Sequence, residues 1–380
     1  MLAQQRIWTE SAGWQSIEGF SDLKDTAQIV FVFGGKDILK QKSRFDEIQS
    51  FYPNARIVGC STAGEIIGEQ IYDNSLIVTA IYFEHTRLQF SKKRVDNMEN
   101  SFNVGEELAR DLNKEDLSHV FILSDGLSVN ASSLVKGLCK NLPKHVAVTG
   151  GLAGDQALFK ETLVFLDALP ETNTIVGIGF YGTRLKIGYG SMGGWTSFGV
   201  DRLVTRSKGC VLYELDGQLA LDLYKKYLGE KASGLPATGL LFPLSIRLEN
   251  KNSHLVRTIL GINEEDGSMT FAGDIPEGSY VRLMKANFEH LVEGAAEAAK
   301  KCCEILSDSP PIVSILISCV GRKLILKQRV EEELEVIQEI FGDKTMLTGF
   351  YSYGELCPIE RDKQSELHNQ TMTITSFYET

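Results

Sequence analysis

Long apolar runs alternate with polar, helix-like segments along the chain, and three pairs of runs follow one plan. Near-continuous Val, Ile, Leu and Phe predicts strands that are covered on both faces, as in parallel sheets. An amphipathic segment separates the two runs of each pair, which predicts a βαβ unit. The pairs are "IVFVFGG" (29–35) with "ARIVGCSTAGEI" (55–66), "HVFILSDGL" (119–127) with "VAVTGGLAGD" (146–155), and "VSILISCVGR" (313–322) with "TMLTGFYSYGEL" (345–356).

The second run of each pair ends in a glycine followed by an acidic residue. These pairs are Gly64-Glu65, Gly154-Asp155 and Gly354-Glu355. Glycine lets the backbone turn sharply where a strand ends. The carboxylate then sits at the carboxyl end of a parallel strand, the edge where open α/β sheets bind ligands.

The region between the second and third units has a different pattern. Glycine-studded strands lead to an amphipathic helix at 218–229 that ends on a glycine, a common C-cap. Asp-Gly and Glu-Gly turns between alternating strands predict hairpins over 254–284. A long helix is predicted at 287–306, and the final strand "HNQTMTITSFYE" closes the chain.

The predicted class is α/β to α+β, with repeated βαβ-type units forming a mainly parallel sheet and a β-hairpin region inserted in the second half. We expect two domains, since 380 residues exceed one comfortable core. The predicted boundaries are an N-terminal extension at 1–26, a first domain at 27–217 and a second domain at 218–380.

Composition narrows the function. The net charge of −11 argues against nucleic-acid binding, which requires a basic surface. Seven cysteines without C-x-x-C spacing indicate reduced thiols, and no signal peptide or run of about 18 apolar residues is present. We therefore expect a soluble, cytoplasmic protein. The oligomeric state stays open.

Catalytic and metal-binding motifs are weak. "GCSTAG" (59–64) places Cys60 and Ser61 at a strand end, but its second glycine comes one residue later than in G-x-S-x-G. A hydrolase using Cys60 or Ser61 is kept as an alternative. The glycine-rich stretches match no phosphate-binding motif, and the six histidines show no zinc-site spacing. A single histidine could still hold a haem.

The stronger cluster of candidates lies in the second half. Arg257 stands within the apolar stretch "LVRTIL", where an unpaired guanidinium is costly to bury, so it requires a carboxylate from a ligand or from Glu355. Arg322 follows the first strand of the third unit, and Tyr351 and Tyr353 flank the end of the second. Arginine, aromatic walls and a carboxylate suit a small amphoteric ligand such as an amino acid. An internal Arg–Glu pair that stabilises the fold explains them equally well.

Six stretches together resemble the FIST domain family, in that family's order and over nearly the whole chain. They are "VGCSTAGEI", "GGLAGD", "VTRSKGCVLYELDG", "SCVGRKLIL", "GFYSYGEL" and "LHNQTMTIT". The front half resembles the FIST N-terminal domain and the back half the FIST C-terminal domain. The resemblance implies a non-catalytic sensor in signal transduction that binds a small ligand, proposed to be an amino acid. It also implies a separate histidine kinase or diguanylate cyclase as partner.

Some members of the family are reported to bind haem and sense nitric oxide, so a haem-based sensor is the alternative, with His254 or His368 as its ligand. Otherwise we expect no cofactor and no metal. The predicted ligand-binding residues are Ser61, Thr62, Glu65, Arg257, Arg322, Tyr351, Ser352, Tyr353 and Glu355.

Overall fold

Three parallel strand pairs occupy the three paired apolar runs. In the computed structural model, which describes residues 1–17, 22–247, 254–307, 309–361 and 363–380, each pair has at least one helix between its strands. The pairs are β3 (Ile29–Gly34) with β4 (Arg56–Ser61), β9 (Leu117–Ser124) with β10 (Ala147–Leu152), and β22 (Val313–Cys319) with β23 (Met346–Ser352). The helices are α1 (Lys36–Leu39) and α2 (Lys42–Phe51), α4 (Ala131–Asn141), and α7 (Val320–Leu326), η4 (Lys327–Arg329) and α8 (Glu332–Phe341).

The first strand of each pair has an antiparallel partner on its other side. These partners are β7 (Leu76–Tyr82), β12 (Thr174–Tyr181) and β26 (Met372–Glu379). The prediction of a mainly parallel sheet is therefore wrong: the fold is mixed α/β, and most pairs of described strands are antiparallel. A parallel neighbour needs a crossover of a dozen or more residues, whereas many connections in this chain are short.

After each second strand the chain leaves its own sheet and enters another. Past Gly64 it forms β5 (Glu65–Ile67), which pairs with β23. Past Gly354 it forms β24 (Glu355–Pro358), which pairs with β10. After β10 it returns to the first sheet as β11 (Val164–Leu166) beside β4. The three glycine–acid pairs therefore mark the points where the sheets exchange strands.

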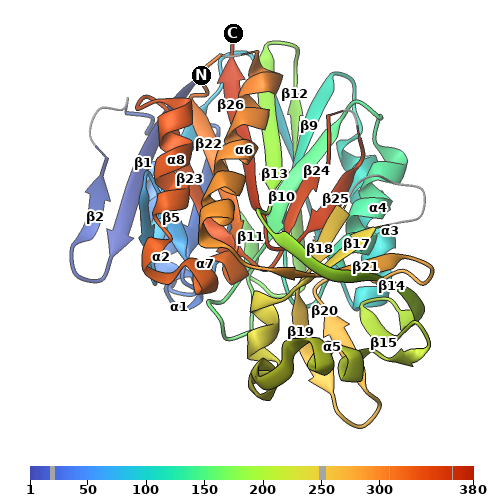
Figure 1. Ribbon diagram of the computed structural model, residues 1–380. Helices are drawn as coiled ribbons and strands as arrows, with labels where there is room; N and C mark the ends of the chain where they lie inside the picture. The colour runs from blue at the N-terminus through green and yellow to red at the C-terminus, as the bar shows by residue number, and fades with distance from the viewer. Residues whose placement is uncertain (18–21, 248–253, 308, 362) are drawn as a thin grey trace.

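Three six-stranded sheets result among the described residues, with the orders β11-β4-β3-β7-β1-β2, β25-β24-β10-β9-β12-β8 and β13-β26-β22-β23-β5-β6. We call them together the three-sheet body. The strands not yet placed are β1 (Leu2–Thr9), β2 (Gly13–Ser16), β6 (Gln70–Tyr72), β8 (Arg87–Arg94), β13 (Leu185–Met192) and β25 (Ser365–His368). Further helices are η1 (Met98–Asn100), α3 (Ser101–Leu112) and α6 (Phe288–Leu306); α6 and α8 lie on the outside of the body (Figure 1).

Apolar side chains from all three sheets meet in one core. The rings of Phe31 in β3 and Phe121 in β9 are 5.6 Å apart, and those of Phe33 in β3 and Phe350 in β23 are 4.8 Å apart. All four side chains are fully buried. The core of the body is therefore built from both halves of the chain. No helix in the described part of the chain is both long and apolar enough to cross a lipid bilayer.

A fourth sheet forms a separate layer with its own core, which we call the β module (residues 196–247 and 254–285). Figure 1 shows much of it below the three-sheet body. It contains the stretch 254–284 that was predicted to form hairpins, together with strands that precede it in the chain. Its elements are β14 (Thr196–Lys208), β15 (Val211–Leu215), β16 (Gln218–Leu219), α5 (Ala220–Leu228), η2 (Gly229–Gly234), η3 (Ala237–Leu241), β17 (Leu244–Arg247), β18 (His254–Arg257), β19 (Ile259–Asn263), β20 (Ser268–Phe271) and β21 (Tyr280–Lys285).

Candidate functional site

A cavity of about 260 Å³ lies between the three-sheet body and the β module. Its body side is formed at the carboxyl ends of the β9/β10 and β22/β23 pairs, the kind of edge at which α/β sheets bind ligands. Leu152 ends β10, Cys319 ends β22 and Tyr353 follows β23. The module side is lined by Cys210, Leu240, Thr258, Leu260 and the stretch 270–273.

The wall of this cavity is apolar and uncharged. Among the described residues that line it, none is Asp, Glu, Lys, Arg or His. Polarity comes from Asn130, Thr258, Thr270 and the Tyr353 hydroxyl, together with two thiols. Mostly apolar walls with a few polar groups are typical of small-molecule sites.

Tyr353 and Phe159 form an aromatic corner of the cavity. Their rings stack with centroids 4.4 Å apart and planes 17° from parallel. Phe159 has a φ of 53°, in the left-handed region that bulky residues rarely adopt. Its backbone N–H donates to the Asp155 carboxylate (2.8 Å) and to the Tyr353 hydroxyl (3.2 Å), which holds it there.

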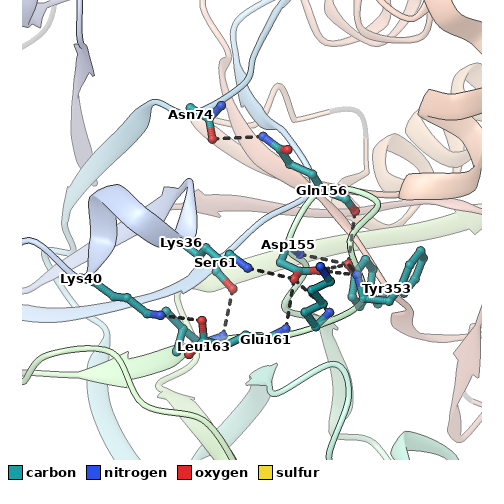
Figure 2. Close-up of polar contacts among 11 residues, drawn as sticks. Lys36, Lys40, Ser61, Asn74, Asp155, Gln156, Glu161, Leu163 and Tyr353 are labelled. Atoms are coloured by element: carbon teal, nitrogen blue, oxygen red, sulfur yellow. Dashed lines mark hydrogen bonds and ion pairs between the residues drawn. The ribbon is translucent and has the colours of Figure 1, made fainter.

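Asp155, shown with its polar contacts in Figure 2, organises the loop that follows it in the chain and carries Phe159. Its buried carboxylate accepts hydrogen bonds from the Tyr353 hydroxyl, the backbone N–H groups of Lys160 (3.1 Å) and Glu161 (3.0 Å), and Lys36 Nζ (3.3 Å). Burial by itself would raise the pKa of Asp155, but these donors outweigh it and lower the pKa. We call residues 155–161 the Asp155 loop.

The outer side of the Asp155 loop contacts the N-terminal segment of the body. Lys40 Nζ lies 2.5 Å from a Glu161 carboxylate oxygen, and the Gln156 amide donates to Asn74 (3.0 Å; Figure 2). The loop therefore links the cavity wall to α1 and to the turn before β7.

The predicted residues of the first unit form a closed cluster away from the cavity wall. The Ser61 hydroxyl accepts from the Leu163 backbone N–H (2.9 Å), and the Thr62 hydroxyl donates to Glu65. Glu65 also accepts from the backbone and hydroxyl of Ser75, both at 2.9 Å. Burial raises the pKa of Glu65 to about 7.

Glu355 repeats this arrangement in the third unit. It accepts from the Ser352 hydroxyl (2.5 Å) and from the hydroxyl (3.0 Å) and backbone N–H (3.3 Å) of Thr371. Thr371 directly precedes β26, as Ser75 directly precedes β7. Burial raises the pKa of Glu355 to about 8.

The predicted pair of Arg257 with Glu355 is not formed. The Arg257 guanidinium is buried and donates to backbone carbonyls of Asp274 (3.2 Å), Val256 (3.1 Å) and Leu367 (3.0 Å). The prediction failed because backbone carbonyls satisfy the guanidinium. Burial lowers the pKa of Arg257 to about 10. Arg257 thus ties β18 of the β module to β25 of the body.

Arg322 forms an internal ion pair, the alternative that the sequence left open, but with Glu333 as its partner, and Tyr351 is hydrogen-bonded to the same carboxylate. Arg322 contacts the Glu333 carboxylate at 2.8 and 3.0 Å and the carbonyls of Gly193 and Leu291. The Tyr351 hydroxyl donates to Glu333 (2.6 Å), and Ser318 adds another bond (3.0 Å). The whole cluster is buried.

Cys60, Ser61 and His368 are not among the described residues that line the cavity. Burial raises the pKa of the Cys60 thiol well above its usual value, which disfavours a thiolate. His368 Nε2 contacts the Cys357 carbonyl (2.9 Å), and burial lowers its pKa to about 4. The His254 side chain lies outside the described part of the structure. The haem alternative therefore stays a prediction.

Of the nine predicted binding residues, Tyr353 is the one that lines the cavity. Sequence reasoning noticed Asp155 through its Gly-Asp turn but did not select it. It missed Phe159 and Thr258, which no motif marks. The sequence did offer one signal for Thr258: it is a polar residue directly after Arg257, within the same apolar stretch "LVRTIL".

Comparison with known proteins places the chain. The model of the FIST N domain matches residues 28–218, and that of the FIST C domain matches residues 220–358. The chain belongs to the FIST domain family. FIST domains are associated with sensing in signal transduction.

A curated relative and a solved structure are also similar. An uncharacterized protein of Methanocaldococcus jannaschii, MJ1623, is 24% identical over 340 residues, covering 82% of this chain and 64% of the relative. This chain thus spans just under two thirds of that protein. The crystal structure of cyanuric acid hydrolase from A. caulinodans is 8% identical with a TM-score of 0.32, covering 93% of this chain and 90% of that one.

Proposed function

We propose that this chain is a non-catalytic sensor whose small-molecule ligand binds in the cavity between the three-sheet body and the β module. The observation that carries the proposal is the cavity itself, which lies at the carboxyl ends of two parallel strand pairs. Membership of the FIST family supports a role in sensing. The proposal includes transfer of the signal to a separate histidine kinase or diguanylate cyclase, as the resemblance implied.

The position of the cavity supports a mechanism for sensing. A ligand there would contact residues of both the body and the β module, so its binding energy would favour one relative placement of the two. It would also contact Phe159 and Tyr353, which are tied to Asp155. The Asp155 loop is then the route by which occupancy reaches the surface near α1.

The buried state of the candidate nucleophiles supports binding rather than hydrolysis. Cys60 and Ser61 are fully buried, and the Ser61 hydroxyl accepts a backbone hydrogen bond. The predicted amino-acid ligand stays a prediction. Its ammonium and carboxylate groups need charged or strongly polar partners, and the lining residues that the structure describes favour a less polar molecule.

A thermal-shift screen of amino acids, other small metabolites and haem tests the proposal. A ligand present at about 100 times its Kd and bound only to the folded state adds about 2.7 kcal/mol of stability. Leu240→Trp fills the cavity, and Leu241→Trp is the matched control because Leu241 is 39% exposed and outside the lining. The shift should disappear in Leu240→Trp and persist in Leu241→Trp. A shift that survives both changes would place the ligand elsewhere.

A further inference from the structure

We infer that the occupant of this cavity is an uncharged, mainly apolar molecule of about two fused rings that has one hydrogen-bonding group facing Thr258. The inference rests on the proposed function, because it specifies the ligand class of the same site. It is argued from the volume of the cavity, the charges around it and the state of one hydroxyl.

Volume sets the size of the ligand. The cavity measures about 260 Å³. An engineered apolar cavity of about 150 Å³ is filled by benzene. The present cavity therefore has room for one ring more, but not for a large cofactor. Phe159 and Tyr353 offer a fixed aromatic corner against which a flat molecule can pack.

The charged groups next to the wall are already engaged. Arg257 precedes Thr258 in the chain, and its guanidinium donates to three carbonyl oxygens. Asp274 follows Gly273 and accepts from Lys136 (3.1 Å) and Asn130 (3.2 Å). The Asp155 carboxylate accepts from five donors: the Tyr353 hydroxyl, Lys36 Nζ and the backbone N–H groups of residues 159, 160 and 161. A charged ligand would lose its hydration at this wall without a free counter-charge among the described lining residues.

Thr258 supplies the evidence for a polar group on the ligand. Thr258 is one of the residues that line the cavity, and it is 4% exposed. The hydroxyl oxygen has no hydrogen-bond partner among the described residues. The Thr258 carbonyl, by contrast, accepts from the Ala272 N–H (2.9 Å). Buried hydroxyls are normally paired, and an exception at a cavity points to a ligand as the partner.

Three probes of similar shape test separately whether the ligand needs a hydrogen-bonding group and whether it must be uncharged. Indole is neutral and carries one N–H, indene has the same ring frame without it, and tryptophan adds an ammonium and a carboxylate. We would measure Kd for each by ligand-observed NMR titration with the full chain. We expect indole to bind about fivefold more tightly than indene, the value of one ordinary hydrogen bond, and tryptophan to bind more weakly than both.

Two isosteric variants show which threonine hydroxyl accepts the hydrogen bond from indole. Thr258→Val should reduce the indole-to-indene ratio to about one while leaving indene affinity unchanged, because only the hydrogen bond is removed. Thr270→Val, on the same wall, is the matched control and should keep the ratio. Loss of the ratio in Thr270→Val alone would overturn the role of Thr258.

Leu240→Trp separates failure of this inference from failure of the proposed function. Indole and indene binding should both be abolished in Leu240→Trp and retained in Leu241→Trp. A charged metabolite that binds more tightly than indole and is lost in Leu240→Trp would overturn the ligand class while the cavity keeps its function. If no probe binds the wild-type protein at millimolar concentration, the inference is wrong. If the metabolite screen also shows no ligand sensitive to Leu240→Trp, the proposed function fails as well.

Discussion

Tyr351 and Tyr353 are two residues apart at the end of β23, yet they belong to different regions of the molecule. Tyr351 donates to Glu333 within a closed, buried cluster that includes Arg322. Tyr353 donates to Asp155 and lines the cavity. The two residues were predicted to form one binding wall. Their separation shows that a polar side chain at a strand end either stabilises the core or faces a ligand, depending on what packs against it.

The three glycine–acid turns repeat this contrast. Glu65 and Glu355 are enclosed by hydroxyl groups and one backbone N–H each, and burial raises their pKa values. Asp155 occupies the corresponding turn of the second unit, but it accepts from several N–H groups and from Lys36, and its pKa is lowered. The same glycine–acid motif thus forms two turns that only stabilise the core and one turn that supports the cavity wall.

The largest expected effect on stability lies in the buried cluster of Arg322, Glu333 and Tyr351. Arg322→Met leaves the Glu333 carboxylate buried without its cation, which should lower the free energy of unfolding by about 3–5 kcal/mol. Urea denaturation measures this. The double variant Arg322→Met/Glu333→Leu should recover much of the loss. If the single variant were as stable as the wild type, the cluster would not be the closed structural region described above.

Asp155→Asn should have the next largest effect, because charge-assisted hydrogen bonds contribute about 1.5–3 kcal/mol. The local consequence should be faster hydrogen exchange at the amides of Phe159, Lys160 and Glu161, measured by NMR or mass spectrometry. Lys40→Gln is the control: it removes only the exposed pair with Glu161 and should change stability by about 0.5 kcal/mol or less. Unchanged exchange in Asp155→Asn would contradict the organising role of Asp155.

The raised pKa of Glu355 predicts that the stability of the protein depends on pH near neutrality. Its pKa is raised from the ordinary value of 4.5 to about 8 in the folded protein, so between these values the folded state holds a proton that the unfolded state has lost. Stability from this group therefore falls as pH rises, by about 1.4 kcal/mol per unit. Glu355→Gln should remove about 2 kcal/mol of the decline between pH 6.5 and 8.

The pH window and its control follow from the other buried groups. Glu65, whose pKa is raised to about 7, adds to the decline up to about pH 7. His119 and His368 have pKa values lowered to about 3 and 4, so they act in the opposite direction, but only below the ordinary value of 6.5. Asp155→Asn should keep the decline above pH 6.5, because the stability that Asp155 contributes is lost only as pH falls below its ordinary value of 3.8. If stability declined equally in Glu355→Gln and the wild type, Glu355 would already be ionised in the folded protein at these pH values.

The smallest effect is expected at Thr258 and has the opposite sign. Thr258→Val removes a buried hydroxyl that has no hydrogen-bond partner among the described residues and keeps the side-chain shape, so the ligand-free protein should gain about 1 kcal/mol. Differential scanning calorimetry measures the shift in Tm. Thr270→Val, whose side chain is only partly buried, should change stability little. A destabilised Thr258→Val variant would mean that the hydroxyl already has a partner.

The sequence by itself determined the three strand pairs, the helices between them and the special character of the glycine–acid turns. These follow from local pattern, since a continuous apolar run must be covered and a glycine permits a sharp turn. Nothing in the pattern of 349–358 could show that Tyr351 would meet Glu333 on α8, because that contact depends on how the helix packs.

Only the tertiary structure decided which strand ends form a site. The cavity exists because the β module lies over the β9/β10 and β22/β23 ends, while Glu65, Glu355 and Arg322 are enclosed by other segments. Thr258 and Phe159 acquire their roles from residues far away in the chain. Burial, hydrogen-bond partners and pKa values depend on such long-range contacts, so local sequence identifies candidate polar groups, and packing selects those that face a ligand.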